Sequence, residues 1–344
     1  MLNYLSERYK TFTKRKYFNK AQNIKKRYAF IGTGSHARTY LYPVLQHLGI
    51  PLAFIFSKHF SNSKSMCMLY KNCEPAKELK TILDKEAVEG VFVCTDPSSH
   101  YNIVKQLLEA GKNVFVEKPA CKALQELNDL LAIKGKYILH VNFQQRFSPA
   151  VEYLKKITSA TKFYRIEYLT GIYPEGNPIN ELFIHPLDLT LFLFDSIKDF
   201  AVKKIKTTDG ITFLIQTEHN NGIAGELKLS TAYSWQNAQE NIEVFAGKEY
   251  YTCNFPHHLK RTILPSSVLG LPFEKLLRTP VKEEIILNAN NISTSSANHT
   301  AWLYGFYQSI ESFIDKVENG EQSSDKEIQS LIRLYQLMEK LEHL

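Results

Sequence analysis

Apolar segments of strand length alternate with longer amphipathic segments in the first half of the chain. Strands are predicted at residues 28–31, 52–56, 91–94, 114–116 and 137–143, with helices that end at residue 48 and cover 101–110 and 121–134. Strands that alternate with helices of this length are typical of a parallel, doubly wound sheet. We therefore predict an α/β domain over residues 27–145.

The pattern changes after Pro149. Helices are predicted over 150–157 and 182–195, and strands over 162–169, 201–207, 212–217, 223–231 and 240–246. Consecutive strands joined by short turns favour a largely antiparallel sheet. Residues 256–300 are predicted to be irregular, and helices over 301–318 and 324–343 close the chain. We predict a second α/β domain over residues 146–344 with a largely antiparallel open sheet, whose closing helices can pack back on the first domain.

Composition excludes several classes of protein. The chain has 344 residues, of which 44 % are hydrophobic and 22 % charged, so global disorder and a fibrous fold are excluded. The most apolar run, 187–194, is too short for a membrane helix, and the N-terminus lacks the apolar stretch of a secretory signal. The five cysteines are scattered without partners at metal-ligand spacing, so neither a metal site nor a disulfide framework is predicted. We expect a cytoplasmic protein.

The net charge of +7 is concentrated at the N-terminus. Nine lysines and arginines lie within residues 1–27 against a single acid, Glu7, so the rest of the chain is nearly neutral. This distribution argues against nucleic-acid binding by the body of the protein. Residues 1–26 are predicted to be a basic extension, which either solubilises the chain or forms an amphipathic helix on an acidic membrane or partner.

The first predicted strand runs directly into the turn Gly32-Thr33-Gly34-Ser35-His36-Ala37. In such a turn Gly32 permits the sharp bend, Gly34 lets the backbone approach a pyrophosphate, and Ala37 allows close packing of helix on strand. The helix N-terminus adds free N–H groups and a partial positive charge. Its place after the first strand of an α/β domain favours a dinucleotide site over a plain glycine-rich turn. The predicted contacts are Gly32, Gly34, Ser35, His36 and Ala37.

The end of the second strand carries information on the cofactor. Sites that prefer NAD usually place a carboxylate here, on the ribose 2′-hydroxyl. The residues present are Ser57, Lys58 and His59, with no acid in reach. Because a lysine and a hydroxyl suit a 2′-phosphate, Ser57 and Lys58 predict NADP(H) as the preferred cofactor, with NAD(H) possible. The alternative is that Lys58 is a solvated loop residue.

Two later strand ends carry polar residues that border the same crevice. The strand over 114–116 ends in Glu117-Lys118-Pro119, and Pro119 restricts the backbone of Lys118, which is thereby aimed at a substrate over the nicotinamide. Residues 95–100 follow the strand over 91–94 and are positioned to wall the nicotinamide ribose. Taken alone, Lys118 could equally be a surface lysine beside a turn.

A third group of polar residues lies in the second domain. Glu181, His185 and Asp188 are spaced by four and three residues, which places them on one face of a helix. Because proline is tolerated only in a first helical turn, the helix should begin about one turn before Pro186. His185 would then lie near the positive end of the helix dipole, which favours a neutral imidazole that can act as a base. The alternative is a structural histidine.

Taken together, these residues resemble the Gfo/Idh/MocA family of NAD(P)-dependent oxidoreductases, and most closely its MviM-like branch. The resemblance covers most of residues 27–344. It rests on the segments 32–37, 95–100, 110–114 with 117–119, 142–149, His185-x-x-Asp188, 304–306 and 313–315. It implies a Rossmann domain followed by an α/β domain whose open sheet often mediates dimers or tetramers.

The resemblance also implies roles for individual residues. Lys118 would hydrogen-bond the reacting oxygen, and His185 would exchange the hydroxyl proton as general acid and base. Glu181 stands where the family has an aspartate four residues before the catalytic histidine, and it would orient His185 or a substrate hydroxyl. Further cofactor contacts are assigned to Thr95, Pro97, His100, Glu117, Lys118 and Arg146.

The function predicted from the sequence is hydride transfer between a nicotinamide and a carbinol or carbonyl carbon of a sugar, a sugar derivative or a cyclitol. The predicted partners are a small sugar-type substrate and further copies of the chain in a homodimer or homotetramer. The alternative is a catalytically retired member of the fold that binds a nucleotide as a sensor or scaffold, which Glu181 and the altered loop before it favour.

Overall fold

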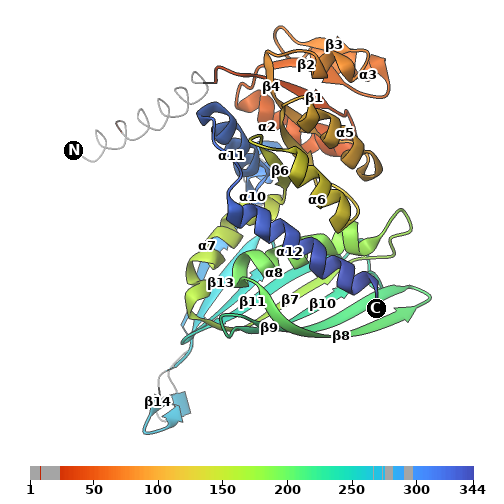
Figure 1. Cartoon of the computed structure of the whole chain (residues 1–344). Helices are drawn as coiled ribbons and strands as arrows, with labels where there is room; N and C mark the ends of the chain where they lie inside the picture. The colour runs from red at the N-terminus through yellow and green to blue at the C-terminus, as the bar shows by residue number, and fades with distance from the viewer. Residues whose placement is uncertain (1–7, 9–23, 266, 273, 276–281, 290–296) are drawn as a thin grey trace. The chain divides into compact units, whose positions relative to one another are not determined.

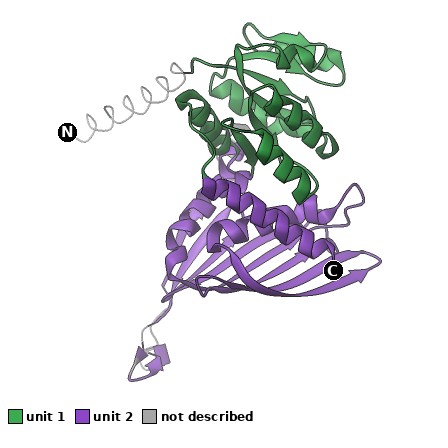
Figure 2. Ribbon diagram, viewed as in Figure 1, with its two compact units in different colours: residues 1–142, 306–324 green, residues 143–305, 325–344 purple. Residues whose placement is uncertain are grey.

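The computed structural model describes residue 8 and residues 24–265, 267–272, 274–275, 282–289 and 297–344. It divides into two compact units (Figures 1 and 2). Unit 1 consists of residues Met1–Asn142 and Phe306–Ser324, and unit 2 of Phe143–Gly305 and Asp325–Leu344. The basic extension predicted at residues 1–26 lies outside the described residues except for Arg8 and residues 24–26.

Unit 1 is built on a sheet of six parallel strands in the order β3-β2-β1-β4-β5-β6. The strands are β1 (Arg27–Ile31), β2 (Leu52–Phe56), β3 (Glu74–Ala76), β4 (Val88–Val93), β5 (Asn113–Glu117) and β6 (Leu139–Asn142). The chain order reverses between β1 and β4, and ligands of such sheets bind at the carboxyl ends of the strands beside that point. This sheet and the second one described below confirm the predicted fold class.

Helices cover both faces of this sheet, which explains why its central strands are apolar throughout. The helical elements are η1 (Ala37–Leu41), α2 (Tyr42–His47), α3 (Phe60–Cys67), α4 (Lys80–Leu83), α5 (Pro97–Glu109), α6 (Leu124–Ile133) and α11 (Phe306–Asn319). Phe92 of β4 and Phe115 of β5 are fully buried, and the ring of Phe313 on α11 packs against both. A segment from near the end of the chain therefore completes the core of unit 1.

Unit 2 contains a sheet of eight strands in the order β16-β13-β12-β11-β7-β10-β9-β8. The strands are β7 (Thr161–Leu169), β8 (Ile197–Thr207), β9 (Gly210–His219), β10 (Ala224–Ser230), β11 (Gln239–Ala246), β12 (Glu249–Asn254), β13 (His258–Ile263) and β16 (Lys282–Asn288). All neighbouring pairs are antiparallel except β7 and β10. A small hairpin, β14 (Ser267–Val268) with β15 (Leu271–Pro272), lies between β13 and β16.

Helices lie on one face of this sheet and leave the other face open (Figure 1). The remaining helical elements are η2 (Gln144–Phe147), α7 (Pro149–Ile157), η3 (Thr158–Ala160), η4 (Ile179–Phe183), α8 (Ile184–Phe194), α10 (Ala297–Leu303) and α12 (Asp325–Glu342). Alternate residues of β9 are buried and exposed, as expected for a strand that is covered on one side only.

Two predictions about this half of the chain are wrong. Residues 256–300 contain β13 and β16 and are not irregular throughout. The helix that carries His185 begins earlier than one turn before Pro186, because the π-helical turn η4 precedes α8. The same arrangement occurs in unit 1, where the π-helical turn η1 precedes α2 and its Pro43. In both places the backbone hydrogen bonds of the helix change from the α-helical to the wider π-helical spacing just before a proline, which has no N–H to donate to a regular α-helical turn.

Candidate functional site

In the glycine turn at the end of β1, Gly32 leaves no room for a side chain, whereas Gly34 has free space around it. A Cβ atom on Gly32 would lie 2.0 Å from the carbonyl oxygen of Cys94, and the φ angle of +112° there also favours glycine. A Cβ atom on Gly34 would meet nothing within 4 Å. Gly34, Ser35 and His36 are exposed, and Ala37 is fully buried where the helix packs on the sheet. The turn therefore bends tightly against β4 and presents free backbone at the start of a helix, which fits a pyrophosphate.

The two residues that predict the 2′-phosphate lie directly after β2. The Ser57 hydroxyl lies 2.8 Å from the Ser63 hydroxyl of α3 and donates to the carbonyl oxygen of His59. Lys58 is exposed, and within the described part of the chain no carboxylate forms an ion pair with its amino group. This lysine is therefore available to an anionic group of a ligand.

A buried chain of hydrogen bonds leads from the glycine turn to α11. Glu117, at the end of β5, accepts a hydrogen bond of 2.7 Å from the Asn142 amide and lies 3.4 Å from His36 Nε2. The Ser309 hydroxyl donates to Asn142 at 2.7 Å and lies 3.0 Å from His140 Nε2. Asn142 and Ser309 are fully buried, and Glu117 is 5 % exposed.

This chain holds Glu117 as a charged group. Burial raises the pKa of the Glu117 carboxyl, but His36, the Asn142 amide and the positive charge of Lys118 together outweigh it, so the pKa lies below its ordinary value. The carboxylate therefore stays ionised next to Lys118, which is half-buried and joined to Pro119 by a cis peptide bond.

His100 serves the interior of unit 1. It is 1 % exposed, and its Nδ1 lies 2.7 Å from the carbonyl oxygen of Pro119 while its Nε2 lies 3.1 Å from that of Thr95. Burial lowers the pKa of the ring, against the opposing effect of the two carbonyl groups. His100 therefore joins the ends of β4 and β5 to each other, and the cofactor contact predicted for it stays a prediction.

Thr95 and Pro97 lie at the exposed side of the same strand end. The Thr95 hydroxyl is 2.8 Å from that of Ser99, and Pro97 opens α5 behind the N-cap residue Asp96. Both remain candidates for cofactor contacts.

In unit 2, Arg146 and Asp188 form a buried ion pair. Arg146 Nε donates to Asp188 Oδ2 at 2.8 Å, its Nη2 donates to Oδ1, and it also reaches the Ser330 hydroxyl at 3.2 Å. Burial lowers the pKa of Arg146, but the charge and hydrogen bonds of Asp188 outweigh it and raise the pKa, so the guanidinium stays charged. Burial raises the pKa of Asp188 against the opposing charge and hydrogen bonds of Arg146. Both partners of Arg146 lie in unit 2, and the cofactor contact predicted for this residue stays a prediction.

Glu181 and His185 lie on either side of the change from η4 to α8. The Tyr173 hydroxyl donates to Glu181 Oε2 at 2.5 Å, and a Cβ atom on Gly176 would lie 2.1 Å from Glu181 Oε1. Glu181 is therefore held against the loop that precedes its helix. His185 is the second residue of α8 and is half-buried. Asp188, the third residue of the predicted face, is bonded to Arg146 and not to either of them.

Glu240 is a candidate that the sequence analysis missed. Its Oε2 accepts a hydrogen bond of 2.9 Å from Gln145, while its Oε1 and the side-chain oxygen of Gln145 are buried without a partner among the described residues. Burial raises the pKa of Glu240 to about 8. Burial also raises the pKa of neighbouring Tyr168, with a smaller contribution from Glu240. The sequence carried one signal: Glu240 has the same strand phase as the apolar Ile242 and Val244, so an acid stands at an inward position.

The described residues contain neither a metal-binding cluster nor a membrane-spanning helix. No group of three or more His, Cys, Asp or Glu side chains there could hold a metal ion. None of the helices in the same part of the chain is both long and apolar enough to cross a membrane.

Comparisons with known proteins identify the family of unit 1. Residues 26–143 match the model of an oxidoreductase family with an NAD-binding Rossmann fold. The chain is 28 % identical over 183 residues to the uncharacterised oxidoreductase YhhX of Escherichia coli, which covers 48 % of this chain and 53 % of the relative. It is also 28 % identical over 163 residues to UDP-N-acetylglucosamine 3-dehydrogenase of Acidithiobacillus ferrooxidans, over 43 % and 51 % of the two chains. The match thus spans about half the length of each relative.

Solved structures share the fold of both units. A dehydrogenase from Chromobacterium violaceum matches with a TM-score of 0.80 and 13 % identity over 92 % of this chain and 94 % of that one. The dehydrogenase MviM from Clostridium difficile matches with a TM-score of 0.75 and 17 % identity over 93 % and 99 %. Levoglucosan dehydrogenase, in complex with NADH and levoglucosan, matches with a TM-score of 0.72 and 14 % identity over 92 % and 96 %. At these identities the likeness is one of fold.

Proposed function

The chain belongs to the Gfo/Idh/MocA family of NAD-binding oxidoreductases, and we propose that it transfers hydride between NADP(H) and a carbinol or carbonyl carbon of a sugar, a sugar derivative or a cyclitol. The observation that carries this proposal is the strand-end edge of unit 1. There the open turn at Gly34, the exposed Lys58 and the adjacent residues Glu117 and Lys118 lie at the carboxyl ends of one parallel sheet. The sugar-type substrate is suggested by relatives that oxidise sugars.

The residues present fit a dinucleotide. The backbone around Gly34 and the exposed Ser35 and His36 would hold the pyrophosphate at the helix N-terminus. Ser57 and Lys58 would hold a 2′-phosphate, for which a charged lysine is the more useful partner. Bound nicotinamide supplies or accepts the hydride, and the protein contributes position and charge.

Two side chains are proposed to act on the reacting oxygen. The Lys118 ammonium donates a hydrogen bond to that oxygen and stabilises negative charge on it. The His185 imidazole takes the hydroxyl proton during oxidation and returns it during reduction. Glu117 keeps a fixed negative charge beside Lys118, because its own hydrogen bonds hold it ionised. Glu181, bonded to Tyr173, positions the start of the helix that carries His185.

Titration of the protein with NADPH and, separately, with NADH tests the cofactor assignment through nicotinamide fluorescence. Tighter binding of NADPH is expected, because no acid stands at the end of β2 to pair with a free ribose. Equal or reversed preference would discard the 2′-phosphate site. Failure to bind either nucleotide would refute the proposed function.

The catalytic roles are tested by variants with the preferred cofactor bound. Lys118→Ala should lower turnover by about 10²- to 10⁴-fold while nucleotide affinity stays nearly unchanged. His185→Ala should do the same, and the double variant should be little slower than the slower single variant, because two residues that act on one oxygen are not additive. If the losses of turnover in the two single variants simply multiplied in the double variant, Lys118 and His185 would act independently of each other.

A retired nucleotide-binding sensor or scaffold is the second candidate. It is favoured by the bond of Glu181 to Tyr173, which turns the carboxylate toward the loop. This candidate predicts tight NADPH binding together with no hydride transfer to any member of a sugar and cyclitol panel. Tyr173→Phe distinguishes the two, because the turnover of an enzyme should change when the Tyr173 hydrogen bond to Glu181 is removed.

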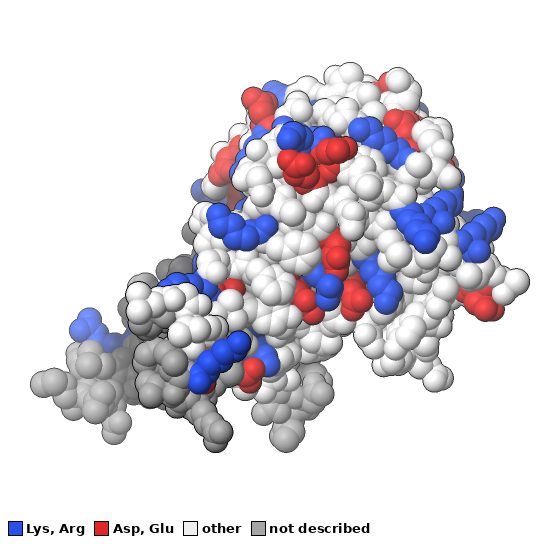
Figure 3. Space-filling view, turned by 90° about the horizontal axis from the view of Figure 1, so that it is seen from below, with Lys and Arg blue, Asp and Glu red and all other residues white. Residues whose placement is uncertain are grey.

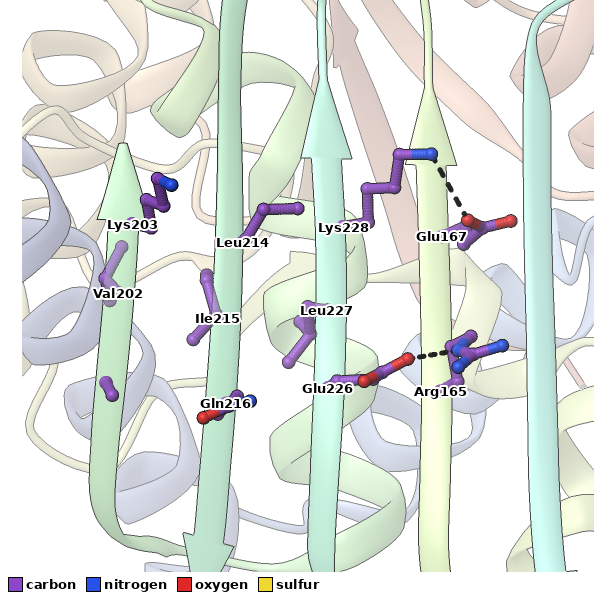
Figure 4. A pocket seen from close by; sticks show the side chains of 11 residues that line it. Arg165, Glu167, Val202, Lys203, Leu214, Ile215, Gln216, Glu226, Leu227 and Lys228 are labelled. Atoms are coloured by element: carbon purple, nitrogen blue, oxygen red, sulfur yellow. Dashed lines mark hydrogen bonds and ion pairs between the residues drawn. The ribbon is translucent and has the colours of Figure 1, made fainter. Parts of the chain in front are cut away.

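We further propose that the open face of the unit 2 sheet pairs with a second copy of the chain. The acids and bases of this face largely neutralise one another, with Arg165 bonded to Glu226 and Lys228 3.6 Å from Glu167 (Figure 4). A hollow of about 580 Å³ lies beside these pairs. Figure 3 shows that charged groups on this side of the molecule are separated by broad uncharged areas.

Apolar side chains on the same face supply contact area. Leu214 is 39 % and Phe245 37 % exposed, and the ring of Phe245 lies 4.5 Å from that of Tyr250. Leu214→Glu should convert a homodimer or homotetramer into smaller species in light scattering coupled to gel filtration. A wild-type chain that is monomeric at micromolar concentration would refute this pairing.

The five cysteines are free thiols, which suits the reducing cytoplasm as the proposed location.

A further inference from the structure

Two cysteines of unit 1 lie within reach of each other. The Sγ atom of Cys73 lies 2.9 Å from that of Cys67, and the Cys73 thiol donates to the Cys67 sulfur. Cys67 is the last residue of α3 and is 5 % exposed, while Cys73 stands just before β3 and is half-buried. Among the free cysteines of the structure, this is the pair joined by a hydrogen bond.

The segment between the two cysteines is an exposed turn. Met68 is 82 % and Leu69 57 % exposed, and Asn72 has a φ of +59°, which asparagine tolerates better than most residues. Arg27 reaches the Asn72 carbonyl oxygen at 3.5 Å. A small oxidant can therefore approach the pair from the solvent side of this turn.

We propose that Cys67 and Cys73 are a site of reversible disulfide formation that uses hydrogen peroxide as the oxidant. In the first step the Cys67 thiolate attacks one peroxide oxygen, the O–O bond breaks, and Cys67 becomes a sulfenic acid as one water leaves. In the second step the Cys73 sulfur attacks the Cys67 sulfur and releases the second water. The two thiols lose two electrons and two protons, the peroxide is reduced to two waters, and a dithiol reverses the reaction.

The surroundings suit Cys67 as the attacking group. The hydrogen bond from Cys73, together with that of the Ile55 backbone, lowers the pKa of Cys67 against the opposing effect of burial. The pKa of Cys73 is raised, because its proton is held by the Cys67 sulfur and because it is partly buried. The thiolate is the form that reacts with peroxides.

The pair is connected to the proposed cofactor site through α3. Ser63 and Cys67 are the two buried residues of this helix and lie one turn apart on the same face. The Ser63 hydroxyl is 2.8 Å from that of Ser57, which we assign to the 2′-phosphate. Closing the disulfide brings the two sulfur atoms to about 2.05 Å from each other and pulls on the C-terminal end of α3. The same helix contacts Ser57 through the Ser63 hydroxyl. This effect of the disulfide on the cofactor site rests on the proposed function, and we expect it to weaken NADPH binding.

The experiment uses the full chain and hydrogen peroxide at stoichiometric concentration. Trypsin cuts after Lys64, Lys71 and Lys77, so the two cysteines fall in different peptides, 65–71 and 72–77. Without reductant, mass spectrometry should find these two peptides joined, and titration of the denatured protein should find three free thiols in place of five. The dissociation constant of NADPH should rise about fivefold and return after dithiothreitol, as expected when one neutral hydrogen bond is disturbed.

Two variants complete the test. Cys73→Ser keeps Cys67, Met66 and Met68 but cannot form the disulfide. Any rise of the NADPH dissociation constant that survives in this variant is therefore independent of the disulfide and would overturn its link to the cofactor. Cys253→Ala removes a buried thiol of unit 2 and should keep the full response. Failure to find the joined peptides would refute the disulfide site. Joined peptides with an unchanged NADPH constant would refute its link to the cofactor, and a reduced protein that binds no nucleotide would refute the proposed function alone.

Discussion

Replacing Asn142 by leucine should destabilise unit 1 by removing the support of a buried charge. The Asn142 amide donates 2.7 Å to the Glu117 carboxylate and accepts 2.7 Å from Ser309, and its side chain is fully buried. A hydrogen bond to a charged group contributes about 1.5–3 kcal/mol and a neutral one about 0.5–1.5 kcal/mol. The expected loss in the free energy of unfolding is therefore about 2–4.5 kcal/mol at pH 7, measured by urea denaturation.

The pH dependence of this loss separates it from simple damage to packing. The folded-state pKa of Glu117 is depressed, so its contribution to stability is present above the unfolded pKa and is lost as the pH falls through the folded pKa. Asn142→Leu raises the folded pKa, so the difference between variant and wild type should shrink as the pH is lowered from 7 toward 4.

A matched control lies on the neighbouring strand. The Asn113 amide donates to the carbonyl oxygen of Glu89 and its side-chain oxygen accepts from the Ile138 backbone, both at 3.0 Å, so its partners are neutral. Asn113→Leu should cost about 1–3 kcal/mol from its two neutral bonds, with no change of that cost between pH 7 and 4. If the two variants lose the same free energy with the same pH dependence, Glu117 is not held ionised by Asn142 and the reasoning fails.

Three further predictions concern the cofactor turn and the sheet of unit 2. Lys58→Asp should raise the NADPH dissociation constant by about tenfold or more in the fluorescence titration, with little change for NADH. Gly32→Ala should lower the free energy of unfolding by about 3 kcal/mol because its Cβ would meet Cys94, whereas Gly34→Ala should fold normally and raise the NADPH constant about tenfold. Glu240 binds a proton more tightly in the folded than in the unfolded state, so the free energy of unfolding of the wild type should fall between about pH 5 and pH 8. Glu240→Gln should remove this part of the fall, which denaturation at pH 5 and at pH 8 would measure.

The elements that sequence predicted well are those whose burial follows their pattern. The strands at 28–31 and 52–56 and the helix over 150–157 are apolar where they are buried. Residues 60–83 were missed because α3 buries Ser63 and Cys67, a serine and a cysteine among polar neighbours, and so shows no apolar stripe. The strand β16 was missed for the opposite reason: most of its residues are exposed at the sheet edge, so no alternation marks it.

Candidate site residues were harder to predict than elements, because sequence shows which groups are polar but not which partners they find. The Gly32 turn needed only a local bend, and the structure gives that bend a steric reason in Cys94. The partners of His100, by contrast, are two carbonyl groups from separate strand ends. Such hydrogen-bond partners depend on tertiary packing, and no residue spacing in the sequence predicts them.

The completeness of hydrogen bonding offers a way to separate structural polar residues from ligand contacts in unit 2. Arg146 is buried with a carboxylate and a hydroxyl as partners, so its side chain is accounted for within the fold. Glu240 and Gln145 share one hydrogen bond, and among the described residues the other Glu240 oxygen and the Gln145 amide oxygen are buried without a partner. Because the raised pKa of Glu240 keeps this carboxyl largely protonated at neutral pH, the Gln145 oxygen is the acceptor that lacks a donor. An unsatisfied buried acceptor costs about 1–3 kcal/mol, which a bound hydroxyl would recover. A substrate rich in hydroxyl donors therefore fits Glu240 and Gln145 better than it fits Arg146, and Gln145→Leu should raise the Michaelis constant for a sugar without changing NADPH affinity.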